Sequence, residues 1–383
     1  MENKNLIIKK EYRAEIDGLR ALAVFAVIIN HFNKSFLPSG YLGVDIFFVI
    51  SGYVITSSLS KRKIEKFNEF IIGFYERRVK RLIPALVFYV LPTSFLICFF
   101  NPIPTGHLKT GLISLFGLSN ITLFLKSTNY FAPIQELNPY AHTWSLGVEE
   151  QFYIFFPFLI WLTGFGGRSQ KGSRNLFFVI LILIIISLIA FIYFYSNNQS
   201  AAYYLMPLRI WEIGSGCLLF LFTQNKGLII SYIKKIPPEL IIILMLINIF
   251  LPAELSPLPH ISITFLTLLL IGSIKKENLT FNFLTNKAVL HFGLISYSLY
   301  LWHWGILSIS QFTIGIHWWS LPFQFLLIYI FSIISYKFIE NPLRKEVWSS
   351  NKLTTISKGF LTLISSGFVL LILDMPLNGK LYL

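Results

Sequence analysis

Four ionisable residues stand within the two apolar segments of residues 15–59: Asp17, Arg20, His31 and Asp45. Burying a charge in hydrocarbon is costly, so ionisable residues in membrane segments are candidates for function. Arg20 and His31 are eleven residues apart, which on a helix amounts to about 1100° of rotation and about 16 Å of rise. We therefore expect one helix face to carry a permanent cation near one membrane surface and an imidazole near the other. The imidazole could accept a proton or carry an acyl group.

Plainer structural interpretations of the same residues stay open. His31 could be an interfacial histidine that is hydrogen-bonded to a backbone carbonyl. Asp45 falls near the start of the second apolar segment, at about the depth of His31. It could orient the imidazole, pair with a cation, or simply be favoured there by the helix dipole.

Further candidates lie in later apolar segments. Glu149 and Glu150 follow the sequence HTWSLGV. Because neighbouring helical residues point about 100° apart, we expect only one of them to face a pocket. That carboxylate could raise the basicity of an imidazole, hold a hydroxyl group, or pair with a cation. His303 lies between Trp302 and Trp304; an aromatic belt at the membrane interface explains the tryptophans but not the histidine.

Two pairs of charged residues have helical spacing. Arg78 and Arg81 are three residues apart, so they share a helix face and could clamp phosphates, or merely anchor a cytoplasmic loop to lipid phosphates. Arg209 and Glu212 have the same spacing, and we expect them to pair with each other. The remaining histidines fall near loop ends, where we expect interfacial positions: His107, His142, His260, His291 and His317.

The composition is that of a polytopic membrane protein. The 383 residues are 55% hydrophobic and 13% charged, whereas soluble domains carry about a quarter charged residues. The net charge of +14 reflects basic residues gathered in particular loops, so we interpret it as a topology signal and expect no nucleic-acid partner. Both cysteines lie in apolar segments, so neither a disulfide nor a metal site is expected. No nucleotide-binding loop, dinucleotide fingerprint, HExxH or nucleophile-elbow pattern is present.

The apolar segments predict an all-α protein. They fall near residues 16–33, 42–60, 82–100, 107–125, 143–163, 175–195, 208–223, 238–251, 259–274, 288–310, 319–340 and 358–374. Of the 32 basic residues, 26 lie in 1–20, in 61–81 and in the loops after 163, 223, 274 and 340, which places these regions in the cytoplasm. Alternation then fails at 107–125, for which we predict a re-entrant or surface-lying hairpin buried in protein.

The predicted topology has about eleven transmembrane helices, with the N-terminus in the cytoplasm and the C-terminus outside. Residues 1–345 would form one membrane domain, and residues 346–383 a cytoplasmic linker, the last transmembrane helix and a short external tail. The topology also predicts depth. The outer half of the membrane would hold His31, Asp45, Glu149, Glu150, Arg209, Glu212 and His303, and the cytoplasmic edge would hold Arg20, Arg78, Arg81 and Glu340. Two polar layers would suit a reaction with one reactant on each side of the membrane.

Several motifs together resemble the acyltransferase-3 family of integral membrane O-acyltransferases. The resemblance covers about residues 12–345 and rests on EIDGLRALAV, the Arg20-(ten residues)-His31 spacing, GVDIFFVISGYVI, Arg78-x-x-Arg81, HTWSLGVEEQFYIFFP, SYSLYLWHW and FIENPLR. It implies a multi-pass protein of a bacterial inner membrane. The implied co-substrate is acetyl-CoA or another acyl-CoA in the cytoplasm, with no metal. The implied acceptor is a hydroxyl of an extracytoplasmic glycan such as lipopolysaccharide, peptidoglycan or exopolysaccharide.

The resemblance also implies roles for particular residues. His31 would be the essential histidine, supported by Arg20, and Arg78 and Arg81 would contact the coenzyme. Glu340 matches another acidic position that the family tends to need. Asp45, Glu149, Glu150 and His303 are candidates for orienting the reacting groups, whereas Asp17, Arg209 and Glu212 have structural or undetermined roles.

The chain departs from one pattern within the family. It is most similar to members that carry a C-terminal extracytoplasmic SGNH hydrolase-like domain, but it ends at Leu383 after the last apolar segment. It could act alone, work with a separate SGNH-type partner, or be truncated. A secondary transporter of an acyl donor or lipid-linked sugar, with His31 as a proton relay, is the main alternative. No matching pair of broken helices supports it.

Overall fold

The computed structural model describes residues 12–60, 66–101, 103–127, 137–166, 169–224, 228–375 and 381. These residues form helices and no strand, as predicted. The α-helices are α1 (Ala14–Phe32), α2 (Gly43–Ser60), α3 (Phe67–Phe100), α4 (Thr105–Leu115), α5 (Ser119–Ser127), α6 (Trp144–Thr163), α7 (Gly172–Asn197), α8 (Gln199–Tyr204), α9 (Ile210–Gln224), α10 (Leu228–Ile233), α11 (Pro238–Phe250), α12 (Leu258–Ser273), α13 (Leu279–Leu284), α14 (Lys287–Leu294), α15 (Ser296–Phe312), α16 (Leu321–Ile334), α17 (Asn341–Lys345) and α18 (Lys352–Asp374). Short 3-10 turns lie at Gly40–Leu42, Ala141–Thr143, Met206–Leu208 and Ala253–Leu255, and a π-helical turn at Ser335–Glu340.

Several helices have the length and composition of membrane spans. Within the described residues, five are long and apolar enough: Gly40–Ser60, Phe67–Phe100, Gly172–Asn197, Leu321–Lys345 and Lys352–Asp374. These helices differ in how much of their apolar surface the protein itself covers. The protein buries 72% of the most apolar window of α2 but only 22% of that of α7. The exposed face of α7 is a band of phenylalanine and isoleucine, which only hydrocarbon would solvate well. The chain is therefore an all-helical membrane protein, and the count of eleven crossings stays a prediction.

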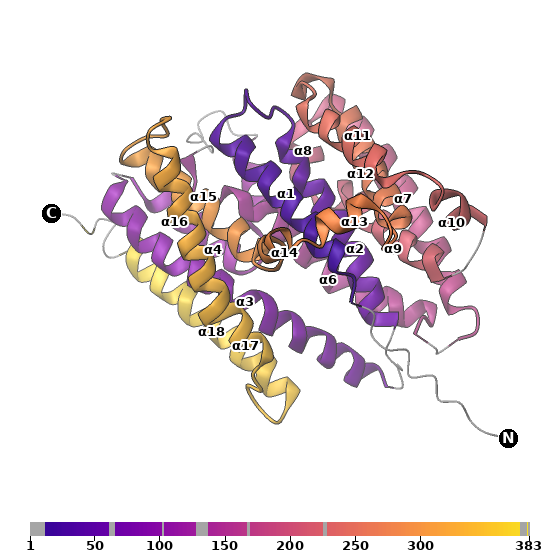
Figure 1. The fold of residues 1–383 in the computed structure, drawn as a ribbon. Coiled ribbons are helices and arrows are strands. Elements are labelled where there is room, and N and C mark those ends of the chain that lie inside the picture. The colour runs from indigo at the N-terminus through magenta and orange to yellow at the C-terminus, as the bar shows by residue number, and fades with distance from the viewer. Residues whose placement is uncertain are drawn as a thin grey trace.

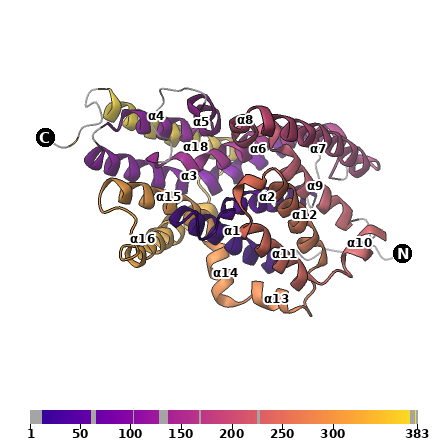
Figure 2. The same cartoon turned by 90° about the horizontal axis from the view of Figure 1, so that it is seen from above.

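Helix α1 lies in the middle of the molecule and carries the residues with which the sequence analysis began. Figures 1 and 2 show it between α2 and α15, and α14 also packs against it. Helix α2 in turn lies directly against α9. A Cβ at Gly52 would overlap the backbone of Ile213, and one at Gly216 would overlap the backbone of Val49. Small residues thus let the two backbones meet, as in other membrane helix pairs.

Helix α3 differs from its predicted bounds. The sequence predicted a span over 82–100 after a cytoplasmic loop, but the helix begins at Phe67 and has 34 residues, about 51 Å of rise. This exceeds the hydrocarbon thickness of about 30 Å, so much of the predicted loop is a helical extension of the span. The first part of the predicted loop, residues 61–65, lies outside the described residues. Helix α18 lies alongside α3 (Figure 1).

Two other predicted segments are each divided into two helices. Segment 107–125 forms α4 and α5, with Gly117 at a positive φ of 68° between them. Helices of 11 and 9 residues rise only about 17 and 14 Å, so this segment does not cross as one helix, in agreement with the hairpin prediction. Segment 288–310 forms α14 and α15, which are separated at Ile295.

Candidate functional site

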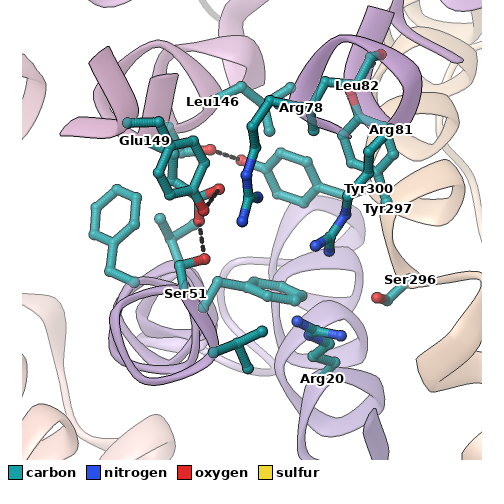
Figure 3. A pocket seen from close by; sticks show the side chains of 16 residues that line it. Arg20, Ser51, Arg78, Arg81, Leu82, Leu146, Glu149, Ser296, Tyr297 and Tyr300 are labelled. Atoms are coloured by element: carbon teal, nitrogen blue, oxygen red, sulfur yellow. Dashed lines mark hydrogen bonds between the residues drawn. The ribbon is translucent and has the colours of Figure 1, made fainter. Parts of the chain in front are cut away.

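A cationic cavity, which we call the inner cavity, lies beside the N-terminal half of α1. Its volume is about 80 Å³. Its polar lining comes from five helices: Arg20 on α1, Ser51 on α2, Arg78 and Arg81 on α3, Ser145, Glu149 and Tyr153 on α6, and Ser296, Tyr297 and Tyr300 on α15. In Figure 3 the three guanidinium groups point toward one open space. The structure thus brings Arg20 together with Arg78 and Arg81, which follow it by about sixty residues in the sequence.

The inner cavity carries an excess of positive charge. Arg20 is neutralised by Asp17, because the two side chains are joined by a 2.6 Å ion pair. Neither Arg78 nor Arg81 makes an ion pair with any carboxylate in the described part of the chain. Arg78 instead lies 4.3 Å from the centroid of the Tyr153 ring, a cation–π contact. The carboxylate of Glu149 also lines the cavity and offsets one of these two charges. Half-buried guanidinium groups without an ion-pair partner favour an anion, above all a phosphate, which they can bind bidentately.

A second and larger cavity, the outer cavity, lies beside the C-terminal end of α1. Its volume is about 690 Å³, within the range of small-molecule sites. Its walls are aromatic and polar: Asn30, His31, Lys34, Ser35, Tyr41, His142, Trp144, Tyr195, Gln199, Tyr203, Tyr204, Glu254, His260, Tyr300 and Trp304. The imidazole of His31 therefore faces a protein-lined space and not lipid.

His31 is held by a second histidine from α15. Nδ1 of His31 lies 3.0 Å from Nε2 of His303, and Nδ1 of His303 lies 2.6 Å from the backbone oxygen of Tyr300. A carbonyl oxygen only accepts, so Nδ1 of His303 carries the hydrogen, and Nε2 of neutral His303 must accept. His31 then donates from Nδ1 and keeps a lone pair at Nε2. This tautomer of His31 can take a proton at Nε2.

The two cavities meet at a common wall. Val44 on α2 and Tyr300 on α15 each line both of them. The three arginines lie on the inner-cavity side of this wall, and His31 lies on the outer-cavity side. The cationic cavity and the cavity lined by His31 are thus neighbours, with Val44 and Tyr300 between them.

Comparison with known proteins identifies the family. A family model described as an acyltransferase domain matches residues 13–336, most of the chain. The chain belongs to the acyltransferase-3 family. The O-acetyltransferase OatA of Staphylococcus aureus strain NCTC 8325 / PS 47 is 33% identical to it over 350 residues, and OatA sequences of strains COL and MRSA252 match equally. These matches cover 88% of this chain and 58% of the relatives, so the chain spans little more than half of their length. No solved structure matches the chain.

Only one of the two adjacent glutamates lines the inner cavity. Glu149 accepts hydrogen bonds from Ser51 at 2.6 Å and from Tyr153 at 3.3 Å. It lies on the arginine side of the common wall and not in the lining of the outer cavity. Glu150 points instead toward Gly117, in the turn between α4 and α5. Glu149 therefore lines the inner cavity and Glu150 does not.

Asp45 does not orient His31. It accepts a hydrogen bond from His260 at 2.7 Å and makes a 3.3 Å ion pair with Arg209. The expected pair of Arg209 and Glu212 is present at 3.2 Å, so one guanidinium bridges both carboxylates. Of the roles considered for Asp45, the structure shows pairing with a cation, and the group that orients His31 is His303.

The carboxylates around Arg209 could also be considered as a metal site. Ligand atoms of Asp45, Glu212 and His260 lie within 4.8 Å of one another, and all three residues are buried. The guanidinium of Arg209 stands among them, however, and contacts both carboxylates. It supplies a positive charge to both carboxylates from within the protein, although both oxygens of Glu212 lack a hydrogen-bond partner among the described residues.

Glu340 does not line either cavity. It belongs to the π-helical turn, and its carboxylate accepts a hydrogen bond from Ser298 on α15 at 2.8 Å. The turn thereby ties α16 to α15, the helix that carries His303. The position is buried, which agrees with a role in supporting the site.

Two histidines were placed wrongly by sequence reasoning. We expected His142 and His260 at the interface, but both are buried, with 4% and 1% of their surface exposed. The ring of His142 lies 5.4 Å from that of His303, and neither of its nitrogens has a hydrogen-bond partner in the part of the chain that the structure describes. Their positions at helix starts suggested exposure, whereas neighbouring helices cover them. Tyr300 was missed too, since a tyrosine in an apolar helix gives no signal of its own.

Proposed function

We propose that this chain is a membrane O-acetyltransferase. It would take the acetyl group from cytoplasmic acetyl-CoA and transfer it to a hydroxyl of an extracytoplasmic glycan. The observation that carries the proposal is the pair of cavities, one cationic and one lined by His31, which share a wall. The names of the relatives, O-acetyltransferases of Staphylococcus aureus, support the same reaction.

The charge of the inner cavity suits the phosphates of the coenzyme. Its phosphates would bind Arg78 and Arg81, which lack carboxylate partners among the described residues. The pantetheine arm would extend past Arg20 toward His31. That offset of about 16 Å along α1 is similar to the length of the arm, on the order of 15–20 Å. The thioester would then come to the common wall, on the other side of which His31 lies.

His31 would act on the acceptor as a general base. Its Nε2 lone pair takes the proton of the hydroxyl while the hydroxyl oxygen attacks the thioester carbonyl carbon. The carbon–sulfur bond breaks, and the imidazolium returns the proton to the thiolate of the coenzyme. Alternatively, Nε2 attacks the carbonyl carbon, the carbon–sulfur bond breaks, and the thiolate of the coenzyme leaves. In a second step the hydroxyl oxygen attacks the acetyl group on His31, the bond from Nε2 to the acetyl carbon breaks, and the hydroxyl proton passes to the thiolate. In both routes His303 holds the imidazole through Nδ1.

The outer cavity suits a sugar. It offers aromatic faces from Trp144, Tyr203 and Trp304, against which the apolar face of a pyranose ring can pack. Hydroxyl, amide and imidazole groups surround them. The unpartnered nitrogens of His142 are available to an acceptor hydroxyl, since buried polar groups normally have a partner.

The proposal is tested with purified protein, labelled acetyl-CoA and soluble glycan acceptors. We expect His31→Ala to lower transfer by at least about a hundredfold, as for loss of a general base. We expect Arg78→Ala/Arg81→Ala to raise the KM of acetyl-CoA. Matched controls are His317→Ala, an exposed histidine, and Arg77→Ala, on the same helix but outside the cavity lining.

Three results would contradict the proposal. Undiminished transfer by His31→Ala removes the imidazole from the chemistry. If KM rises equally for Arg77→Ala and for the double variant, the effect comes from the positive charge of the helix in general and not from phosphate binding by Arg78 and Arg81. Movement of a substrate across the membrane without covalent transfer favours the transporter alternative.

A further inference from the structure

We infer that Val44 and Tyr300 form a neck between the two cavities that sets the length of the acyl group this protein accepts. The inference rests on the proposed function, because it concerns the acyl group on its way from the coenzyme to His31. It assigns specificity to two side chains that neither bind phosphate nor exchange protons.

The cavity on the donor side is the smaller of the two. The inner cavity has about 80 Å³ and the outer cavity about 690 Å³. Val44 and Tyr300 line both, and they are only 5% and 6% exposed. A thioester carbonyl that reaches His31 from the inner cavity must therefore pass these two side chains, and the carbons of its acyl chain must fit beside them.

Tyr300 is a fixed wall of the neck. Its hydroxyl has one hydrogen, which it donates to the backbone oxygen of His142 at 2.9 Å. The hydroxyl of Ser145 lies 2.7 Å away and donates to the tyrosine oxygen. Figure 3 shows the Tyr300 ring standing at the edge of the inner cavity. Because its backbone oxygen also holds His303, moving Tyr300 would disturb the support of His31 as well.

Val44 is the side chain of the neck that can be replaced without breaking a hydrogen bond. It lies in the first turn of α2, and its side chain makes no hydrogen bond. Removing two carbons by Val44→Ala widens the neck, and adding one by Val44→Ile narrows it, while the polar groups around Tyr300 keep their partners. In apolar pockets one methylene of substrate changes discrimination by about 10- to 200-fold, so small changes in width should be measurable.

The test compares acetyl-, propionyl- and butyryl-CoA as donors to one glycan acceptor. The measured quantity is the ratio of kcat/KM for each longer donor to that for acetyl-CoA, which does not depend on the fraction of folded protein. We expect Val44→Ala to raise the propionyl-to-acetyl ratio about tenfold and Val44→Ile to lower it. Val49→Ala is the matched control, because Val49 is a fully buried valine of the same helix that lines neither cavity.

The outcomes separate this inference from the proposed function. A wild-type ratio in both Val44 variants would overturn the inference while leaving the transferase intact. An equal rise in Val49→Ala would also overturn it, because general loosening of α2 would then be the cause. If the wild-type protein transfers no acyl group from any of the three donors, the proposed function fails, and the inference fails with it.

Discussion

Replacing His303 tests how the imidazole of His31 is held. His303 is fully buried and accepts a hydrogen bond from Nδ1 of His31. Between two neutral groups such a bond contributes about 0.5–1.5 kcal/mol, but about 1.5–3 kcal/mol once one partner is charged. When His31 takes up a proton in the transition state, the bond gains about 1–2 kcal/mol. His303→Phe should therefore lower kcat by about 5- to 30-fold.

The measurement is single-turnover acetyl transfer at saturating acetyl-CoA, with KM determined separately. We expect the loss in kcat and an unchanged KM for acetyl-CoA, because His303 does not line the inner cavity. His303→Gln is the conservative variant, since its amide oxygen can still accept from His31, and it should recover much of the rate. A wild-type kcat in His303→Phe, or a loss confined to KM, would refute the reasoning.

Two further predictions concern the scaffold. Arg209→Met leaves two buried carboxylates without their common counter-charge, so we expect a loss of about 3–5 kcal/mol of folding free energy; an unchanged unfolding temperature in detergent would contradict this. Gly52→Ala places a methyl group against the backbone of Ile213 and should cost about 1–3 kcal/mol by overpacking. The control is Gly106→Ala, whose added methyl group meets no atom within 4 Å, so its thermal unfolding should be unchanged. Similar shifts of the unfolding temperature in the two variants would argue against close packing of α2 on α9.

The sequence predicted what depends on local pattern. Helix periodicity placed Arg20 and His31 on α1, and the structure shows each of them lining a cavity. The i, i+3 spacing predicted the pair of Arg209 and Glu212. The charge alternation predicted that segment 107–125 would not cross the membrane as one helix, and it is divided into two short helices.

The sequence could not predict contacts between distant helices. Asp45 is 164 residues from Arg209 and 215 from His260, so its partners depend on how α2 packs against α9 and α12. His142 looked interfacial because it precedes a helix, and its burial comes from α15. The helical extension of α3 was missed because eight basic residues in 61–81 indicate a cytoplasmic position equally well for a loop and for a helix.

The central claim is that donor and acceptor meet from opposite faces of one membrane. The most direct measurement uses proteoliposomes in which the orientation of the protein has been determined by protease accessibility. Labelled acetyl-CoA is supplied on one face, and a membrane-impermeant oligosaccharide is sealed on the other. We predict acetylated oligosaccharide when acetyl-CoA is on the face of the positively charged loops, and none when both reactants are on one face. Transfer only when both share a face would contradict the account.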